Sequence, residues 1–286
     1  MIFITDSGST KCDWIGIDEH GNKLFEKERT KGLNPAILSP EELLLRIQES
    51  DILRKHKEYV RKIYFYGAGC GTVMAAKALQ KVLQNYFPNA EVTVAEDTLA
   101  AVFATVENHE PAVVCIMGTG SNCAYFDGHK THQKVNSLGY VLMDDASGNY
   151  YGKQLIRDYY YKKMPENLRV SFQEKYNVDT DYIKNKLYKQ PNPNVYLASF
   201  AEFMFVNKDA TYITDLIKSG FRIFAENMIF QFKDKLDQVP VHFAGSIAFL
   251  SQDEIREVAA DMGFRVGNFV KRPIEGLVSY HTKKLA

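Results

Sequence analysis

Apolar runs and small-residue turns follow one another along the chain, and the pattern is clearest at its start. Residues 2–4 are apolar, the run stops at Asp6, and a second apolar run follows at 14–17. Short apolar runs of this kind are typical of buried strands, and Gly8 lets the backbone turn tightly between them. We therefore expect a β-hairpin whose turn presents a carboxylate and several hydrogen-bond donors.

The same arrangement returns in the middle of the chain. Residues 112–117 form a continuous apolar run, which is typical of a strand buried on both faces. A turn of small residues at 118–122 follows directly and leads into another apolar run at 123–126. We interpret the two patterns as an internal duplication of a β-hairpin, with the boundary between the halves near Pro111.

The rest of the chain reads as strands alternating with helices, which indicates an α/β fold. Ser39 as N-cap and Pro40 at the first helical position predict the start of a helix of roughly fifteen residues. Further strands are expected at 23–29, 62–66, 91–95, 239–243 and 264–266, and further helices at 74–87, 98–106, 151–160, 247–262 and 274–285. Residues 164–235 read as mostly helical, with core aromatics expected at Tyr182, Phe200, Phe203, Phe221 and Phe224.

Composition limits the classes of function. At 286 residues the chain is long enough for one large domain or two medium ones. Hydrophobic residues make up 45% and charged residues 24%, as in an ordinary globular protein. The 35 basic and 35 acidic side chains cancel, so nothing favours a polyanionic partner and we expect no nucleic-acid binding.

Cysteine usage and hydropathy bear on the setting of the protein. Four cysteines are scattered without a CxxC pair, which favours reduced, packed thiols over a disulfide framework. No run approaches the ~18 apolar residues that a membrane helix needs. The start of the chain also lacks a basic segment followed by a long apolar one. We therefore expect a soluble, cytoplasmic protein without a membrane partner.

The first turn has the chemistry of a phosphate-binding site. Backbone N–H groups around Gly8 and the ammonium group of Lys11 suit phosphate, and so do two hydroxyls, those of Ser9 and Thr10. Asp6 suits a magnesium ion carried by that phosphate. An ordinary hairpin turn is the alternative, because Asp, Ser and Gly are common turn residues. The recurrence of a similar turn later in the chain favours the phosphate site.

Two further junctions carry candidate chemistry. Asp97 follows a predicted strand and precedes a helix, and ligands of open α/β sheets collect at the carboxyl ends of strands. A helix cap is the alternative role for Asp97. Residues 244–246 form another strand–glycine–helix junction, where a helix N-terminus suits anionic or adenine-ribose groups. A plain βα loop remains the alternative there.

These motifs, taken in their order, resemble a known superfamily. Residues 6–14 and 118–122 resemble the two phosphate motifs of the actin-like ATPases, and Asp97 and 244–246 resemble their catalytic aspartate and adenosine motif. The sequence GTGSNC, with two adjacent aspartates downstream, is similar to the BadF/BadG/BcrA/BcrD ATPase family and specifically to N-acetylglucosamine kinases.

The resemblance implies a fold and a reaction. The fold is α/β, with two ribonuclease H-like lobes and an interlobe nucleotide and sugar cleft. Residues 1–111 would form the first lobe and residues 112–286 the second, with a helical insertion. Whether the final helix, about 274–285, packs back on the first lobe is left open. The implied reaction is ATP-dependent transfer of a phosphoryl group to the 6-hydroxyl of an amino sugar, first of all N-acetylglucosamine.

The resemblance also assigns roles to residues. Asp97 would be the general base that takes the proton from the sugar hydroxyl, and Asp6 would order the magnesium–nucleotide complex through water. Nucleotide binding would fall to Asp6, Gly8, Ser9, Thr10, Lys11, Gly118, Thr119, Gly120, Ser121, Gly245 and Ser246. Sugar binding would fall to Asn34, Gly69, Asp97 and Asp144. The implied cofactors are ATP and Mg²⁺, and the partners are a small-molecule amino sugar and a candidate second copy in a homodimer.

Several residues depart from the family pattern. Met143 and Ala146 stand where the family usually has glycine, and Tyr140 stands where it has histidine. The sugar is therefore open between N-acetylglucosamine, glucosamine, N-acetylmuramic acid and another amino sugar, and weak kinase activity is a further outcome. Two other functions remain as alternatives, an ATPase that activates a 2-hydroxyacyl-CoA dehydratase and a non-catalytic sugar sensor or scaffold.

Overall fold

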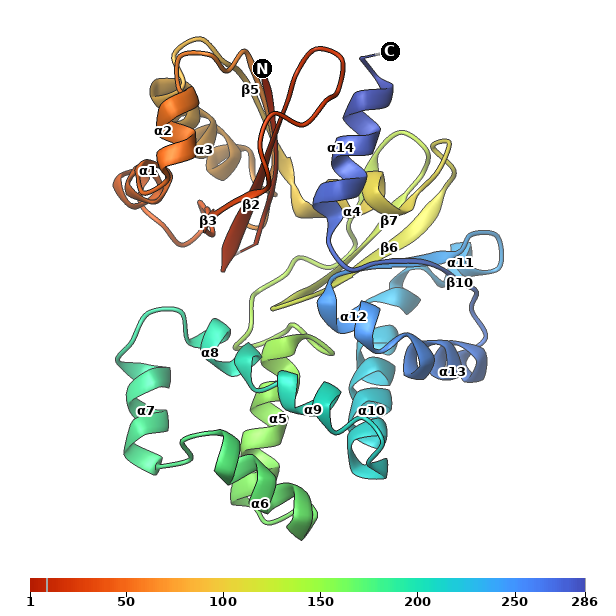
Figure 1. The fold of residues 1–286 in the computed structure, drawn as a ribbon. Coiled ribbons are helices and arrows are strands. Elements are labelled where there is room, and N and C mark those ends of the chain that lie inside the picture. Colours follow the sequence, from red (N-terminus) through yellow and green to blue (C-terminus); the bar gives the residue numbers. More distant parts are fainter. Residues whose placement is uncertain (9, 286) are drawn as a thin grey trace. The chain divides into compact units, whose positions relative to one another are not determined.

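Residues 1–8 and 10–285 are described by a computed structural model of the chain (Figure 1). The chain divides into two compact units. Unit 1 comprises Met1–Asn108 and Arg272–Ala286, and unit 2 comprises His109–Lys271. The sequence pattern put a boundary near Pro111, and the chain passes from unit 1 to unit 2 after Asn108. It returns to unit 1 after Lys271, so the last helix, α14 (Pro273–Lys283), belongs to unit 1.

The sheet of unit 1 has five strands in the order β3-β2-β1-β4-β5. They are β1 (Ile2–Ser7), β2 (Lys11–Ile17), β3 (Glu28–Lys31), β4 (Lys62–Gly67) and β5 (Glu91–Glu96). The first three form an antiparallel meander, and β4 and β5 run parallel to β1. Because β1, β4 and β5 are parallel, the chain leaves all three at the same edge of the sheet.

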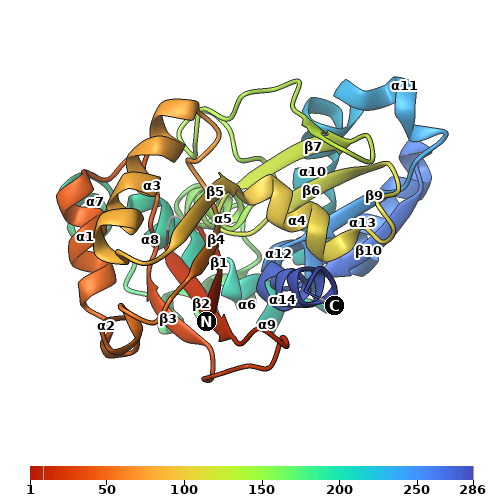
Figure 2. The same cartoon turned by 90° about the horizontal axis from the view of Figure 1, so that it is seen from above.

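Helices cover both faces of this sheet. They are α1 (Pro40–Gln48), α2 (Asp51–His56), α3 (Val73–Tyr86), α4 (Asp97–Thr105) and α14. Figure 2 shows α1, α2 and α3 on one face and α4 with α14 on the other. Phe3 belongs to the core under α1 to α3, whereas Ile2 and Ile4 belong to the core under α4 and α14. This alternation along β1 is the normal consequence of the strand repeat.

The single helix expected after Ser39 is two helices. Its start is confirmed, because the Ser39 hydroxyl accepts a hydrogen bond from Glu42 N–H and the Glu42 carboxylate accepts one from Ser39 N–H. The expected length is wrong. The Ser50 hydroxyl accepts a hydrogen bond from Leu53 N–H at 3.2 Å and so caps a new helix, α2, where the sequence pattern suggested continuation.

The strand expected at 23–29 is also shorter than the pattern suggested. Pairing with β2 is confined to β3, apart from one bridge between Ile17 and Lys23. Between these two points Phe25 packs over Gly16, where a Cβ atom would overlap the phenylalanine ring. The ring is packed against the core under α1 to α3. Burial of this side chain replaces the backbone pairing that a regular strand would have.

Unit 2 repeats the topology of unit 1. Its strands are β6 (Ala112–Met117), β7 (Ser121–Phe126), β8 (Thr131–His132), β9 (Val241–Ala244) and β10 (Val266–Val270). They lie in the order β10-β9-β6-β7-β8, with an antiparallel meander from β6 to β8 and with β9 and β10 parallel to β6. The α/β fold class is confirmed, and the shared strand order agrees with the predicted duplication. The last strand lies later in the chain than expected, because β10 begins at Val266, the final residue of the strand expected at 264–266.

Helices make up most of the remainder of unit 2. They are α5 (Gly148–Tyr160), α6 (Glu166–Lys175), α7 (Thr180–Tyr188), α8 (Pro193–Ser199), α9 (Glu202–Val206), α10 (Thr211–Asn227), η1 (Ile229–Phe232), α11 (Lys233–Leu236), α12 (Ser246–Leu250) and α13 (Gln252–Met262). The four predicted core phenylalanines are buried, but Tyr182 is 39% exposed and its assignment to the core is wrong. The helix expected at 247–262 is interrupted at Ser251. Among the described residues, no helix is long and apolar enough to span a membrane.

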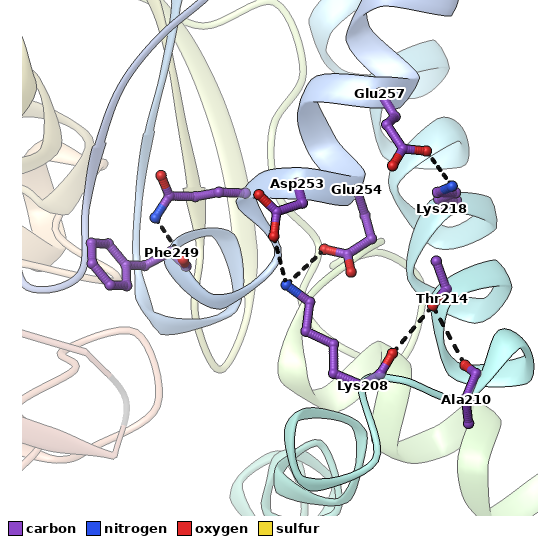
Figure 3. Close-up of polar contacts among 9 residues, drawn as sticks. Lys208, Ala210, Thr214, Lys218, Phe249, Asp253, Glu254 and Glu257 are labelled. Carbon is purple, nitrogen blue, oxygen red and sulfur yellow. Dashed lines mark hydrogen bonds and ion pairs between the residues drawn. The ribbon is translucent and has the colours of Figure 1, made fainter.

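Ion pairs hold α13 beside α10 and the segment before it (Figure 3). Lys208 Nζ lies 3.3 Å from Asp253 Oδ2 and 3.3 Å from Glu254 Oε2. On the next turn of α13, Glu257 pairs with Lys218 of α10. Glu254 is buried, and a buried carboxylate without a counter-charge would be strongly destabilising. Lys208 therefore makes the burial of Glu254 tolerable.

The contact between α4 and α14 gives a test of this fold. A Cβ atom on Gly276 of α14 would lie 2.7 Å from Ala104 Cα and 2.8 Å from Ala104 Cβ. We expect Gly276→Ala to lower the free energy of unfolding of unit 1 by about 1–3 kcal/mol, because overpacking forces the two helices apart. Urea unfolding measures this, with the exposed Ser279→Ala on the same helix as control. Equal stability of the two variants would contradict the expectation.

Candidate functional site

Asp6, near the end of β1, begins a row of charged side chains across three strands. It lies opposite Asp13 on β2, and Asp13 lies opposite Arg29 on β3. Arg29 donates two hydrogen bonds to Asp13, from Nε to Oδ1 at 2.6 Å and from Nη2 to Oδ2 at 3.0 Å. Burial alone would raise the pKa of Asp13, but the hydrogen bonds and charge of Arg29 hold it below its ordinary value. The carboxylate of Asp13 therefore stays ionised and places a negative charge beside Asp6.

Among residues 1–8 and 10–285, the Asp6 carboxylate has no such partner. None of the hydrogen bonds among the described residues ends on it. Burial and then the charge of Asp13 raise the pKa of Asp6 to about 7, while Lys11 opposes the shift. In the described part of the chain no group of three or more His, Cys, Asp or Glu could hold a metal ion. A single carboxylate that accepts no hydrogen bond from the described residues fits Mg²⁺, which keeps several waters and takes few protein ligands.

The turn after β1 is closed by its own backbone. Gly8 N–H donates to the Lys11 carbonyl at 2.9 Å. Gly8 and Lys11 are exposed, and Thr10 is half-buried. Ser9, the remaining residue predicted to bind phosphate here, lies outside the described residues. The hairpin predicted from the sequence is confirmed, and its phosphate-binding role stays a prediction.

Ser7, the last residue of β1, holds three segments together. Its hydroxyl accepts a hydrogen bond from Leu33 N–H at 3.0 Å, and its carbonyl accepts one from Ala68 N–H at 2.8 Å. Leu33 precedes Asn34 and Ala68 precedes Gly69 in the sequence. Two of the three predicted sugar-binding residues of unit 1, Asn34 and Gly69, are thus held close to β1.

Asn34 and Gly69 are packed against each other. Asn34 is buried, and its Oδ1 accepts a hydrogen bond from Ala36 N–H at 2.9 Å. Gly69 has a φ of 79°, and a Cβ atom there would overlap Asn34 Oδ1. Only glycine therefore allows the segment 67–71, which we call the glycine loop, to close over Asn34.

Asp97 is the first residue of α4, at the edge of the sheet where β1 also ends. Glu96 occupies the N-cap position and makes no side-chain cap, so the alternative role of Asp97 as N-cap is wrong. Burial, followed by the charges of Glu96 and Asp6, raises the pKa of Asp97 to about 7. The thiol of Cys70, in the glycine loop, is close enough to be affected by these carboxylates. Burial, followed by the charges of Asp97 and Glu96, raises the pKa of Cys70 to about 12. Asp97 therefore lies close to the loop that carries Gly69.

The second turn, in unit 2, is held by the start of α5. Gly148 N–H donates to the Gly118 carbonyl at 2.8 Å, and Asn149 N–H donates to the Thr119 carbonyl at 3.1 Å. Within the turn, Gly118 N–H donates to the Gly120 carbonyl at 2.9 Å. The turn is thus closed by its own backbone, like the first one, and is additionally fixed to a helix.

Asp144 packs against this second turn with both carboxylate oxygens engaged. Oδ2 accepts a hydrogen bond from Asn149 Nδ2 at 2.9 Å, and Oδ1 accepts one from Ser121 N–H at 3.4 Å. A Cβ atom on Gly120 would lie 2.8 Å from Asp144 Oδ2, which explains the glycine. Burial raises the pKa of Asp144 against the opposing hydrogen bonds. The structure therefore makes Asp144 a support of the turn, and its predicted contact with a sugar stays a prediction.

A pocket of about 190 Å³ opens beside Asp144 within unit 2. Its lining residues are Ser121, Val135, Ser137, Leu142, Met143, Asp144, Asp145, Asn227 and Met228. Asn227 Nδ2 donates to Asp145 Oδ2 at 2.9 Å. The pocket thus combines two carboxylates with apolar walls.

Gly245 precedes α12 next to the second turn. Its φ is 114°, and a Cβ atom there would overlap the carbonyl oxygen of Met117. Glycine is therefore required where the chain passes the end of β6. Ser246 is exposed at the start of α12. Within unit 2 the structure brings together the second turn, Asp144 and Gly245, and within unit 1 it brings together Asp6, Asn34, Gly69 and Asp97.

Solved structures resemble this chain over its whole length. A proposed N-acetylglucosamine kinase from Porphyromonas gingivalis is 33% identical, covers 100% of both chains and has a TM-score of 0.91. The chain belongs to the N-acetylglucosamine kinase-like family. The family predicted from the two turns, Asp97 and the junction at 244–246 is thereby confirmed.

More distant structures share the fold of this family. A proposed N-acetylglucosamine kinase from Chromobacterium violaceum is 13% identical over 98% of both chains, with a TM-score of 0.64. A ROK-family glucokinase from Streptomyces griseus, in complex with glucose and AMPPNP, is 15% identical over 98% of this chain and 97% of that one, with a TM-score of 0.60. No family model and no curated protein matches the sequence.

Sequence reasoning missed three residues that support the candidate site. In the sequence, Ser7 falls within the motif 6–14, Glu96 lies between a predicted strand and Asp97, and Asn149 lies just before the helix expected at 151–160. Each acts through backbone or side-chain contacts with segments far away in the sequence. The only signal was a polar residue at the boundary of an apolar element, which is too common to single them out.

The raised pKa of Asp97 predicts how stability depends on pH. The carboxyl binds its proton more tightly in the folded state than in the unfolded state, where its pKa is about 3.8. Its stabilising contribution is present below pH 4 and is lost as the pH rises through 7. We therefore expect Asp97→Asn to gain stability over the wild type between pH 4 and pH 8. Urea unfolding at both values measures this, with the exposed Asp181→Asn as control, and a gain that is equal at both values would refute it.

Proposed function

We propose that the protein is an ATP-dependent kinase that phosphorylates the 6-hydroxyl of an amino sugar. The observation that carries the proposal is the position of Asp97, a partly buried carboxyl at the carboxyl edge of the sheet, close to the glycine loop that packs on Asn34. The full-length likeness to a proposed N-acetylglucosamine kinase supports the class of reaction. The glucokinase with AMPPNP is consistent with ATP as the donor.

Asp97 would act as the general base. A base works best when its pKa lies near the operating pH, and burial with the charges of Glu96 and Asp6 raises the pKa of Asp97 to about 7. Phosphoryl transfer needs little covalent help from the protein, so positioning and charge neutralisation carry most of the rate. In this proposal Asp97 removes the proton from the 6-hydroxyl, and Asn34 with Gly69 holds the ring that carries it.

The two turns would hold the nucleotide phosphates. Gly8 to Lys11 in unit 1 and Gly118 to Ser121 in unit 2 carry hydroxyls and one ammonium group. The N–H groups of Gly8, Gly118 and Ser121 already donate within the protein, so the backbone contribution would come from the other residues of the turns. Gly245 and Ser246 would bind adenosine. Asp6 would hold Mg²⁺, which neutralises phosphate charge when bound.

The acceptor is proposed as N-acetylglucosamine, with glucosamine and N-acetylmuramic acid as alternatives. The pocket beside Asp144 offers apolar walls to an acetamido group and two carboxylates to an ammonium group. Its wall includes Met143, which departs from the family glycine. The sugar must therefore be decided by assay.

The two other functions have less support. Bridging an iron–sulfur cluster between subunits, as in a dehydratase activator, needs accessible thiols, but all four cysteines are buried and free. A sensor or scaffold does not need a carboxyl in the position of a general base, which is the role that we propose for Asp97. The free thiols agree with a cytoplasmic setting, which we include in the proposal with a homodimer.

The direct test combines purified protein, ATP and Mg²⁺ with a panel of hexoses and amino sugars. We expect sugar-stimulated ADP release, with N-acetylglucosamine as the best acceptor and the 6-phosphate identified by phosphorus NMR. Absence of stimulation by every sugar would overturn the proposal.

Replacement of the base gives a second test. Asp97→Asn keeps the size of the side chain and removes its basicity, so kcat should fall by roughly 10²–10⁴-fold. Sugar binding, measured by calorimetry, should change far less. Asp181→Asn serves as the control for loss of one exposed carboxylate. Turnover near the wild-type level would show that Asp97 is not the base.

A further inference from the structure

The glycine loop lies between two side chains that occupy the space of absent Cβ atoms. On one side, Asn34 Oδ1 fills the position of a Cβ on Gly69. On the other side, a Cβ on Gly71 would lie 2.7 Å from Glu96 Oε1 and 3.1 Å from Glu96 Cδ. The loop is thus wedged between a predicted sugar-binding residue and the residue that precedes Asp97.

Both side chains that contact the glycine loop, Asn34 and Glu96, are held by hydrogen bonds. Asn34 is buried and accepts the hydrogen bond of Ala36 N–H. Glu96 Oε2 accepts a hydrogen bond at 3.1 Å from the hydroxyl of Thr98, whose side chain is buried in the first turn of α4. The Glu96 carboxylate is therefore held between the glycine loop and the start of the helix on which Asp97 lies.

We propose that Glu96 is a positioning residue, which sets the distance between Asp97 and the sugar-binding pair of Asn34 and Gly69 by wedging the glycine loop. The proposal rests on the kinase function proposed above. Its physical basis is that a reacting hydroxyl must meet its base within hydrogen-bond reach, and a misplacement of ~1 Å costs on the order of 10²-fold in rate. Glu96 acts here through its shape and its hydrogen bond, without touching the substrate.

A set of variants separates this role from general destabilisation. Glu96→Ala removes the wedge, and Gly71→Ala displaces the flexible carboxylate end rather than the backbone. Glu96→Gln keeps the length and an acceptor oxygen. With N-acetylglucosamine, ATP and Mg²⁺, we expect the first two variants to lower kcat by about 10–100-fold, with an unchanged KM for ATP. Glu96→Gln should lose much less kcat than Glu96→Ala, and its pH profile should shift to lower pH, because the Glu96 charge that helps to raise the pKa of Asp97 is gone.

The double variant tests whether Gly71 acts through Glu96. Once Glu96 is alanine, the added methyl group of Gly71→Ala meets no carboxylate, so it should cause no further loss of kcat. Additive losses would mean that the two residues act independently and would overturn the proposal. Wild-type turnover in Glu96→Ala, or equal losses in Glu96→Ala and Glu96→Gln, would overturn it as well.

The other side of the loop has its own readout and control. Gly69→Ala should raise the KM for the sugar and weaken sugar binding in calorimetry, because the methyl group displaces Asn34. Gly263 has the same φ of 79° with no atom within 4 Å of an added Cβ, so Gly263→Ala carries the strain without the clash. Equal behaviour of both variants would contradict the wedge. A wild type inactive with every sugar would instead refute the kinase function itself.

Discussion

The register of three parallel strands determines the arrangement of the candidate site in unit 1. Ser7 of β1 pairs with Gly67 of β4, and Gly67 pairs with Glu96 of β5. The first turn, the glycine loop and Asp97 therefore all leave the sheet at one edge, where ligands of α/β sheets collect. A slip of one residue in any strand would move its side chains to the opposite face. The packing of Ile2 and Ile4 on one face and Phe3 on the other prevents that slip.

The two sheets have the same topology but different chemistry at corresponding positions. In unit 1, β5 is followed by Asp97, whereas in unit 2 the corresponding strand, β10, is followed by Lys271. The first turn lies near two carboxylates whose pKa values are raised to about 7. In the second turn, two backbone carbonyls instead accept hydrogen bonds from the start of α5. The duplication therefore supplies two similar turns but only one candidate base.

Local signals in the sequence were enough to place most elements and both turns. Ser39 with Glu42, Gly8 and the apolar run 112–117 act through neighbours within a few residues, so the chain pattern reveals them. Long-range contacts were invisible to that reasoning. Phe25 leaves the expected strand to pack on Gly16, and Asp144 is bound by Asn149 and Ser121. The roles of Gly69 and Gly71 depend on Asn34 and Glu96, which lie about thirty residues away on either side.

The assignment of α14 to unit 1 has a consequence for synthesis on the ribosome. Ile274, Leu277 and Val278 of α14 complete the core that also contains Ile4 and Ile15. Unit 2 is continuous in sequence and can fold as soon as it has emerged, because domains generally fold as units during synthesis. Unit 1 is translated first, yet the face of its sheet that α4 and α14 share is covered by α4 alone until the last helix appears. Unit 1 is thus translated first but completes its core last. The apolar positions that α14 will cover stay accessible throughout the translation of unit 2.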